Sequence, residues 1–454
     1  MTPNSGANRP DIGGPVESPG HIVYDGLNLT PDHGAATYRR RLTSIARTLG
    51  YDVGVIYDTA FTPDKDPLLQ EVLFFDQMRA PHELGRKITL KRRIRTIVDQ
   101  LRYNFMIKAL PLRCGEAVVS QQYADTLTEH DRAYIGRNIL NNSNLNFERT
   151  ANFVNISFYP APDILHCTFP MPLRVRSACN TYTIKDLSSL RLPLSTGKNR
   201  QKTFRLLKKI ADTADHIVTV SETVKRDIVH ILKVDDRRVT NTYQAVTLPQ
   251  KYLARSERAV ENYLDSLYHL EMNGYIIVIT TFESKNDIGR LIREVLSSGV
   301  NIPLVLVIAR GYHDREELDR IIEHKAKTIS RNSVGLWVIC LDYVGLSSLV
   351  NLIRGARAVV FPSLREDCSL PVLEAMMLGT PVVASTSATL SEISGNAALL
   401  VDPCDVEKMA RAITAIVNDA DLRHELGRRG TAQAAKFSLA RYRERVRSLY
   451  ASLA

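Results

Sequence analysis

The chain has 454 residues, more than one hydrophobic core usually serves, so we expect two domains. Hydrophobic residues make up 44% and charged residues 24% of the sequence, which excludes a mainly disordered chain. The net charge of +10 indicates acidic partners, such as phosphorylated ligands, anionic lipid or nucleic acid.

The N-terminal residues 1–20 are rich in Pro, Gly and Ser and lack the apolar core of a signal peptide, so we expect a disordered tail. No run approaches the roughly 18 apolar residues of a membrane-spanning helix. The six cysteines, at positions 114, 167, 179, 340, 368 and 404, show no paired metal-ligand or redox spacing. We therefore expect a cytoplasmic protein that holds no metal.

Short β-rich segments alternate with longer helical patterns, which indicates parallel sheets covered by helices on both faces. Strands are expected at 21–25, 52–57, 163–167, 180–184, 216–220 and 238–243, and then at 275–280, 303–308, 335–340, 357–361, 381–385 and 398–401. The predicted fold class is α/β, with two doubly wound, Rossmann-like domains facing a central cleft. His166 lies near the end of the expected strand at 163–167. It could line the cleft, or it could be a buried structural histidine, and both interpretations stay open.

The two series of strands suggest the domain boundaries. We expect a first domain at 21–248, a linker at 249–272, a second domain at 273–436 and a C-terminal helix at 437–454 that crosses back to the first domain. The segment at about 60–155 fits the alternation worst, and we interpret it as a mostly helical insertion.

Part of that segment, residues 86–108, carries eight basic residues and one acid. Its apolar residues fall on one helical stripe: Leu90, Ile94, Ile97, Val98, Leu101 and Phe105. Such a basic amphipathic helix either packs on the core with a solvated outer face or docks on an anionic membrane surface, so both interpretations stay open. No nucleic-acid recognition motif accompanies the charge, and we expect no nucleic-acid partner.

Two carboxylates stand out in the stretch LREDCSLPVLEAMMLGTPVV, residues 364–383, where Glu366 and Glu374 lie eight positions apart. Ser369 can cap a helix that ends at Gly379, a residue suited to a C-terminal turn. Free N–H groups at the start of this helix would form an anion site that suits a diphosphate. From these residues alone, the favoured interpretation is that Glu374 merely complements the helix dipole and that Glu366 is a solvated loop residue, because acids are common in the first turn of a helix.

This stretch and its continuation SEISGNAALLVDPCDVEKMARAI resemble the donor-binding region of the retaining glycosyltransferases of family 4, which have the GT-B fold. Further similar stretches are GAATY (34–38), TIKDLSSLRLP (183–193), ADHIVTVSETVKRDI (214–228), RVTNTYQAV (238–246) and DIGRLIREVLSSG (287–299). The resemblance implies transfer of a hexose from a nucleotide-diphosphate sugar to a saccharide or lipid-linked saccharide in cell-surface polysaccharide synthesis. It implies no cofactor and no metal.

The resemblance also implies roles for single residues. Glu374 would bind the donor ribose hydroxyls, because a carboxylate can accept two neighbouring O–H groups, and Glu366 would hold hydroxyls of the donor sugar. Gly34 would let the backbone of the first domain approach the phosphate closely. The diphosphate would be bound by amides of Cys368, Ser369 and Leu370.

Several positions depart from the family pattern. Lys185 stands where the family has a His next to the reacting carbon, and Asp367 adds a negative charge beside the expected diphosphate. Asn286 is the counterpart of a phosphate-binding Lys, with Lys285 one position earlier, and Thr281 stands where some members have Arg. Two functions therefore stay open: an active transferase that uses Glu366 and Lys185 at the reacting centre, or a catalytically degenerate GT-B protein that acts as a partner or scaffold in glycan assembly.

Overall fold

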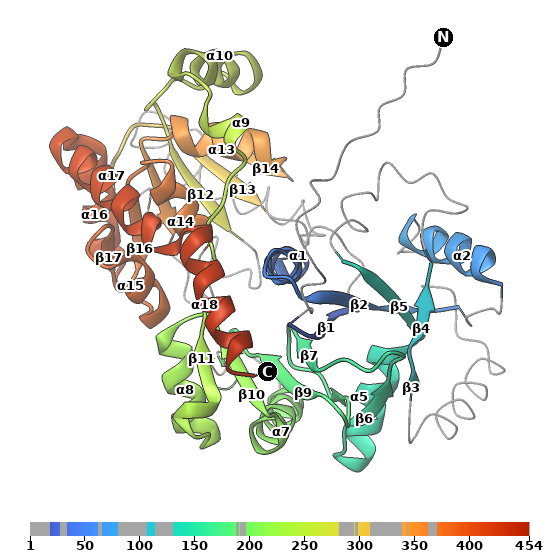
Figure 1. Cartoon of the computed structure of the whole chain (residues 1–454). Helices are drawn as coiled ribbons and strands as arrows, with labels where there is room; N and C mark the ends of the chain where they lie inside the picture. Colours follow the sequence, from blue (N-terminus) through green and yellow to red (C-terminus); the bar gives the residue numbers. More distant parts are fainter. Residues whose placement is uncertain are drawn as a thin grey trace, which may run out of the picture. The chain divides into compact units, whose positions relative to one another are not determined.

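The computed structural model describes residues 19–27, 34–61, 66–79, 107–113, 130–187, 190, 197–280, 295, 298–308, 338–342, 344–361 and 370–453. The chain divides into two compact units (Figure 1). The first unit holds Met1–Thr181 together with Tyr450–Ala454, and the second holds Tyr182–Leu449. Both units are built from parallel strands and helices, so the predicted α/β class is confirmed.

The first sheet has eight strands in the order β11-β10-β9-β7-β1-β2-β5-β4. Its strands are β1 (His21–Gly26), β2 (Asp52–Thr59), β4 (Leu110–Leu112), β5 (Arg132–Arg137), β7 (Ile164–Cys167), β9 (Cys179–Thr183), β10 (His216–Thr219) and β11 (Val239–Asn241). All six residues of β1 are buried, as in a central strand that is covered on both faces. The six strands of the first expected series are therefore present.

The segment at about 60–155, expected as a mostly helical insertion, also contributes strands. Its described part contains α2 (Pro67–Arg79) and α5 (Ile139–Thr150), but β5 and β4 also come from it and extend the main sheet beyond β2. The strand β5 was missed because its sequence, RAYIGR, has only three apolar residues, followed by Gly136 and flanked by Arg132 and Arg137. The expected basic helix does not reach residue 108, since Ile107 and Lys108 form β3.

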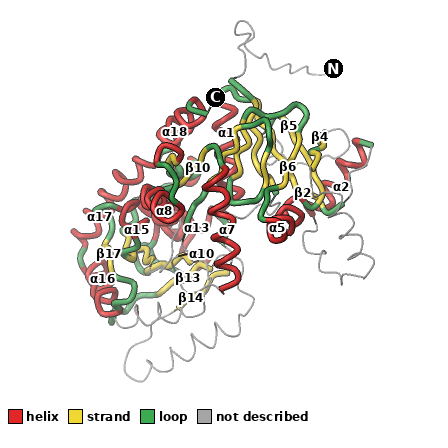
Figure 2. The backbone as a smooth tube through the Cα atoms, turned by 90° about the horizontal axis from the view of Figure 1, so that it is seen from below, coloured by secondary structure: helices red, strands yellow, loops and turns green. Residues whose placement is uncertain are grey.

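A small sheet and further helices complete this part of the chain. The strand β3 (Ile107–Lys108) pairs with β6 (Val154–Ser157), which pairs with β8 (Leu173–Arg174). The helix α5 packs against β2 and β6 (Figure 2). The other helices are α1 (Gly34–Thr48), α7 (Gly197–Thr213) and α8 (Glu222–Leu232).

The second sheet has six parallel strands in the order β14-β13-β12-β15-β16-β17. They are β12 (Ile276–Thr280), β13 (Leu304–Ile308), β14 (Val338–Asp342), β15 (Ala358–Phe361), β16 (Val382–Ser385) and β17 (Leu399–Val401). The described helices of this region are α9 (Gln250–Leu253), α10 (Glu257–Tyr268), α13 (Leu346–Gly355), α14 (Leu370–Met377), α15 (Ala388–Ser394), α16 (Val406–Asn418) and α17 (Ala420–Ala434). All six strands of the second expected series are present.

Alternate residues of the second sheet face two different cores. On one face, Ile277, Val359 and Val382 pack with residues of α10, α13, α14 and α15. On the other face, Ile276 and Val360 pack with residues of α16 and α17. A sheet with helices on both faces explains why its strands are continuous apolar runs in the sequence.

The last helix, α18 (Leu439–Ala451), ends at residues that belong to the first unit. The hydroxyl of Tyr450 lies 2.6 Å from the hydroxyl of Tyr24 and 2.8 Å from Nδ1 of His166. His166 is fully buried and hydrogen-bonded, so it has a structural role and does not line a cleft.

Candidate active site

The order of the second sheet locates a ligand site. Counted along the chain, its six strands lie in the order 3-2-1-4-5-6, and β12 pairs with both β13 and β15. The strand order therefore reverses between β12 and β15. Ligands of such sheets bind at this reversal, outside the carboxyl ends of the strands.

The two segments singled out in the sequence both leave the sheet at this reversal. The strand β12 ends at Thr280, directly before Thr281, Lys285 and Asn286. The strand β15 ends at Phe361, and α14 begins at Leu370. Between those two points stand Glu366, Asp367, Cys368 and Ser369. These seven residues lie outside the described residues, but the strand ends that precede them, Thr280 and Phe361, lie at one edge of the sheet.

The helix α14 carries the second carboxylate of the pair. Val372, Leu373, Ala375 and Met376 are buried in the core, whereas Glu374 is only half-buried. The helix is followed by Gly379 with a φ of 77°, and the amide of Thr380 donates to the carbonyl of Ala375. The expected C-terminal glycine turn is therefore confirmed. Leu370 is the first residue of α14, so its amide is one of the N–H groups that have no partner within the helix.

A second helix holds α14 in place at close range. A Cβ atom added to Gly427 of α17 would lie 2.5 Å from the carbonyl oxygen of Gly379. A Cβ atom added to Gly430 would lie 3.3 Å from Cα of Met376. Glycine at both positions thus lets the backbones of α17 and α14 approach, which fixes the helix that bears Glu374.

The remaining expected site residues lie at the ends of other elements. Lys185 is half-buried and comes two residues after the last residue of β9, next to Ile184, whose amide donates to the carbonyl of Val218. Gly34 is the first residue of α1, in the first unit. Lys185 and Glu374 belong to one compact unit, and each follows the carboxyl end of a strand.

Sequence reasoning missed one carboxylate near this region. Glu392 of α15 accepts hydrogen bonds from the amides of Glu222 and Thr223 at 2.7 and 2.8 Å, and from the Thr223 hydroxyl at 2.6 Å. It therefore caps the start of α8. No sequence signal could reveal this pairing, because the partners are 169 positions apart.

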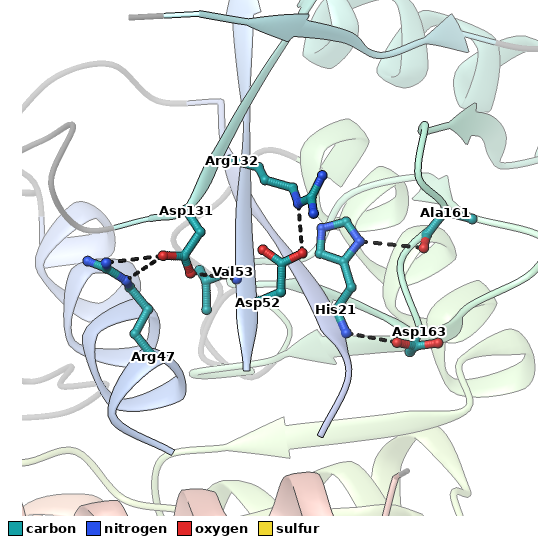
Figure 3. Close-up of polar contacts among 8 residues, drawn as sticks. All are labelled: His21, Arg47, Asp52, Val53, Asp131, Arg132, Ala161 and Asp163. Carbon is teal, nitrogen blue, oxygen red and sulfur yellow. Dashed lines mark hydrogen bonds and ion pairs between the residues drawn. The ribbon is translucent and has the colours of Figure 1, made fainter. Parts of the chain in front are cut away.

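A polar cluster at the amino ends of β1, β2 and β5 lies at the opposite edge of the first sheet (Figure 3). Arg132 donates to Asp52 at 2.7 Å, and Arg47 pairs with Asp131 at 3.1 Å. The amide of His21 donates to Asp163 at 2.7 Å. These contacts join neighbouring strand starts and loops, so the cluster is structural.

Two features are absent from the described residues. No group of three or more His, Cys, Asp or Glu side chains there is arranged to hold a metal ion. Within the same residues, no helix is both long and apolar enough to cross a membrane.

Known proteins are similar to this chain in the region of the strand reversal at β12 and β15. The family described as "Glycosyl transferases group 1" matches residues 275–419, which include β12, β15 and α14. The O-antigen chain mannosyltransferase B of Escherichia coli is 31% identical over 275 residues, which cover 60% of this chain and 69% of that protein.

Solved structures show the same fold over nearly the whole chain. Sucrose-phosphate synthase from Thermosynechococcus elongatus gives a TM-score of 0.60 at 16% identity, covering 95% of this chain and 98% of the other. The Anabaena protein HepE, solved in complex with UDP-glucose, gives a TM-score of 0.61 at 10% identity, covering 95% and 100%.

Two mostly parallel sheets, the second with its reversal at β12 and β15, form the GT-B fold. The chain belongs to the group 1 glycosyl transferases.

Proposed function

We propose that this protein transfers a mannosyl residue from a nucleotide-diphosphate sugar to a saccharide or lipid-linked saccharide acceptor, with retention of configuration and without a metal. The observation that carries the proposal is the half-buried Glu374 on a helix that begins beside the strand reversal. The choice of mannose is supported by the similarity to the O-antigen chain mannosyltransferase B.

The donor binds at the carboxyl edge of the second sheet in this proposal. Glu374 accepts the two ribose hydroxyls, and Glu366 holds hydroxyls of the transferred sugar. The start of α14 at Leu370, with the amides of Cys368 and Ser369, binds the diphosphate. The phosphates are also contacted by Lys285, Asn286 and Thr281, and Asp367 adds a negative charge beside them.

The chemical step needs no protein nucleophile. The bond between the sugar C1 and the leaving phosphate oxygen breaks, and the acceptor oxygen bonds to C1 on the same face. The acceptor proton passes to the departing phosphate oxygen. Lys185 donates a hydrogen bond near the reacting carbon, and the helix start and lysines stabilise the developing charge in place of a metal.

The acceptor binds to the first unit, in which the helix α1 begins at Gly34. We further propose that the protein works at the cytoplasmic face of an anionic membrane through residues 86–108, of which only Ile107 and Lys108 are described. The helix α7 adds positive charge through the exposed Lys202 and Arg205, beside which Phe204 is an exposed apolar residue. Flotation with phosphatidylglycerol vesicles but not with phosphatidylcholine vesicles is the expected result, and equal behaviour with both would contradict membrane docking.

A second candidate function rests on the departures at Lys185, Asn286 and Asp367. In that case the protein keeps the fold but binds no donor, and it acts as a non-catalytic partner or scaffold in glycan assembly. The first experiment separates the two candidates.

That experiment is thermal stabilisation by UDP, GDP, ADP and their sugar conjugates. A ligand at about 100 times its Kd adds about 2.7 kcal/mol to the free energy of unfolding. We expect one nucleotide family to stabilise the wild type and to have no effect on Glu374→Ala. Glu407→Ala, which removes an exposed glutamate of α16, is the matched control and keeps the stabilisation.

If no nucleotide stabilises the folded wild type, the scaffold function replaces the enzyme. Where a donor binds, transfer to an alkyl mannoside in the presence of EDTA tests metal independence. The anomeric coupling constant of the product, measured by NMR, then distinguishes retention from inversion.

A further inference from the structure

The first sheet has a strand reversal of its own, between β1 and β7. The strand β1 pairs in parallel with β2, the next strand along the chain, on one side and with β7 on the other. The segments that leave the carboxyl ends of β1 and β7 therefore run in different directions. In a doubly wound sheet this is the place for a ligand crevice.

A buried carboxylate joins the two strands at that place. Asp25 is the penultimate residue of β1 and is 3% exposed. It accepts hydrogen bonds from both the amide and the hydroxyl of Thr168, the second at 3.0 Å. Thr168 is the first residue after β7 and is 1% exposed.

This arrangement is costly for stability alone. An ionised carboxylate that is removed from water loses several kcal/mol of hydration, and well-packed apolar residues often stabilise such a junction as well or better. A buried carboxyl group at the carboxyl edge of the sheet, where ligands of such folds bind, therefore suggests a role in the site.

The same sheet contains a matched carboxylate whose role is structural. Asp58 is the penultimate residue of β2, and it accepts from the amides of Ile139 and Leu140 at 2.7 and 3.3 Å. These amides belong to the first turn of α5, so Asp58 acts as a helix cap. Thr168 starts no helix, so the contact between Asp25 and Thr168 is not a helix cap.

The carboxylate of Asp25 instead fixes the segment that follows β7. After the buried Thr168 come Phe169 and Pro170, both half-buried, at the carboxyl edge of the sheet. A partly exposed aromatic ring on a fixed backbone is a typical wall of a small-molecule site.

We propose that Asp25, through its two hydrogen bonds to Thr168, is a positioning residue that holds Phe169 and Pro170 as a wall of the acceptor site. The inference rests on the proposed function, because it assigns the acceptor to the first unit. Asp25 itself does not touch the reacting atoms.

The test compares steady-state kinetics of Asp25→Asn, Thr168→Val and Thr168→Ser with the wild type, using octyl α-mannoside as acceptor and the donor that stabilises the wild type. Asp25→Asn and Thr168→Val raise the acceptor KM, or lower kcat/KM for the acceptor, by about tenfold, the usual effect of losing a hydrogen bond to a charged group. Thr168→Ser keeps the hydroxyl and stays within about twofold of the wild type. The thermal stabilisation by donor is unchanged in all three variants.

Asp58→Asn is the control for a buried carboxylate in the same sheet. It keeps the wild-type acceptor kcat/KM, whatever its effect on the unfolding midpoint. Should Asp25→Asn and Thr168→Val fold and keep the wild-type acceptor kinetics, the positioning role is wrong while the proposed function stands. Should they lose donor stabilisation as well, the two residues serve general stability and the inference is again wrong. A wild type that binds no donor and transfers nothing overturns the proposed function itself.

Discussion

The carboxylate of Glu392 accepts both the amide and the hydroxyl of Thr223, at 2.8 and 2.6 Å. It also accepts the amide of Glu222 at 2.7 Å. A side chain of α15 therefore satisfies two of the free N–H groups at the start of α8. Ser221, the N-cap residue of α8, satisfies a third, since it accepts from the amide of Val224 at 3.1 Å.

We expect Glu392→Gln to lower the free energy of unfolding by about 1–3 kcal/mol, because hydrogen bonds to a charged acceptor become weaker or are lost. Urea denaturation followed by circular dichroism measures the change. The control is Glu425→Gln, which removes ion pairs to Arg428 and Arg429 on the surface of α17 and leaves the midpoint unchanged. Equal effects of the two substitutions would contradict the capping role.

Some features of the fold and site could be predicted from the sequence, and others could not. The strands were found where apolar residues form continuous runs, as in the six buried residues of β1, and Gly379 was found because a helix end calls for positive φ. The pair Glu366 and Glu374 was found through its spacing and its resemblance to a family. The contacts of Glu392 with Thr223 and of Asp25 with Thr168 depend on tertiary packing between residues 169 and 143 positions apart, which no local pattern encodes.

The pH dependence of stability contains two opposing contributions in the first unit. Burial raises the pKa of Asp58 to about 6, against the backbone amides that lower it. Burial, helped by Arg39, lowers the pKa of His130 to about 4. Between pH 3.8 and 6 the folded state holds more protons at Asp58, so stability falls as pH rises. Between pH 4 and 6.5 the unfolded state holds more at His130, so stability rises with pH.

Each contribution reaches about 3 kcal/mol, because a tenfold change in proton affinity is worth about 1.4 kcal/mol. We expect Asp58→Asn to make stability rise more steeply than in the wild type from pH 4 to 6.5, and His130→Gln to make it rise less steeply or fall. Urea unfolding across this range measures both slopes. Parallel curves for the wild type and both variants would show that neither group is perturbed in the folded state.

The hydroxyl of Tyr450 serves two buried partners, Tyr24 and Nδ1 of His166. Tyr450→Phe leaves both without this contact inside the first unit, so we expect the free energy of unfolding to fall by about 1–3 kcal/mol. Tyr159→Phe removes a hydroxyl from a side chain that is 90% exposed, and it has no effect. Thermal unfolding of both variants is the measurement, and a wild-type midpoint for Tyr450→Phe would mean that water replaces the hydroxyl.

The approach of α17 to α14 connects packing with donor binding. Gly427→Ala places a methyl group 2.5 Å from the carbonyl oxygen of Gly379, where the neighbour is backbone and cannot rotate away. We expect a loss of about 1–3 kcal/mol in the free energy of unfolding, the usual cost of overpacking. Because α14 carries Glu374, the displacement of α14 also weakens nucleotide binding several-fold. The shift of the unfolding midpoint with nucleotide concentration measures this binding.

The control is Gly345→Ser, at the N-cap of α13, where the space around the glycine is open. It lowers neither the free energy of unfolding nor the affinity for nucleotide. If Gly427→Ala lowers stability but binds nucleotide as tightly as the wild type, α14 does not need α17 to present Glu374.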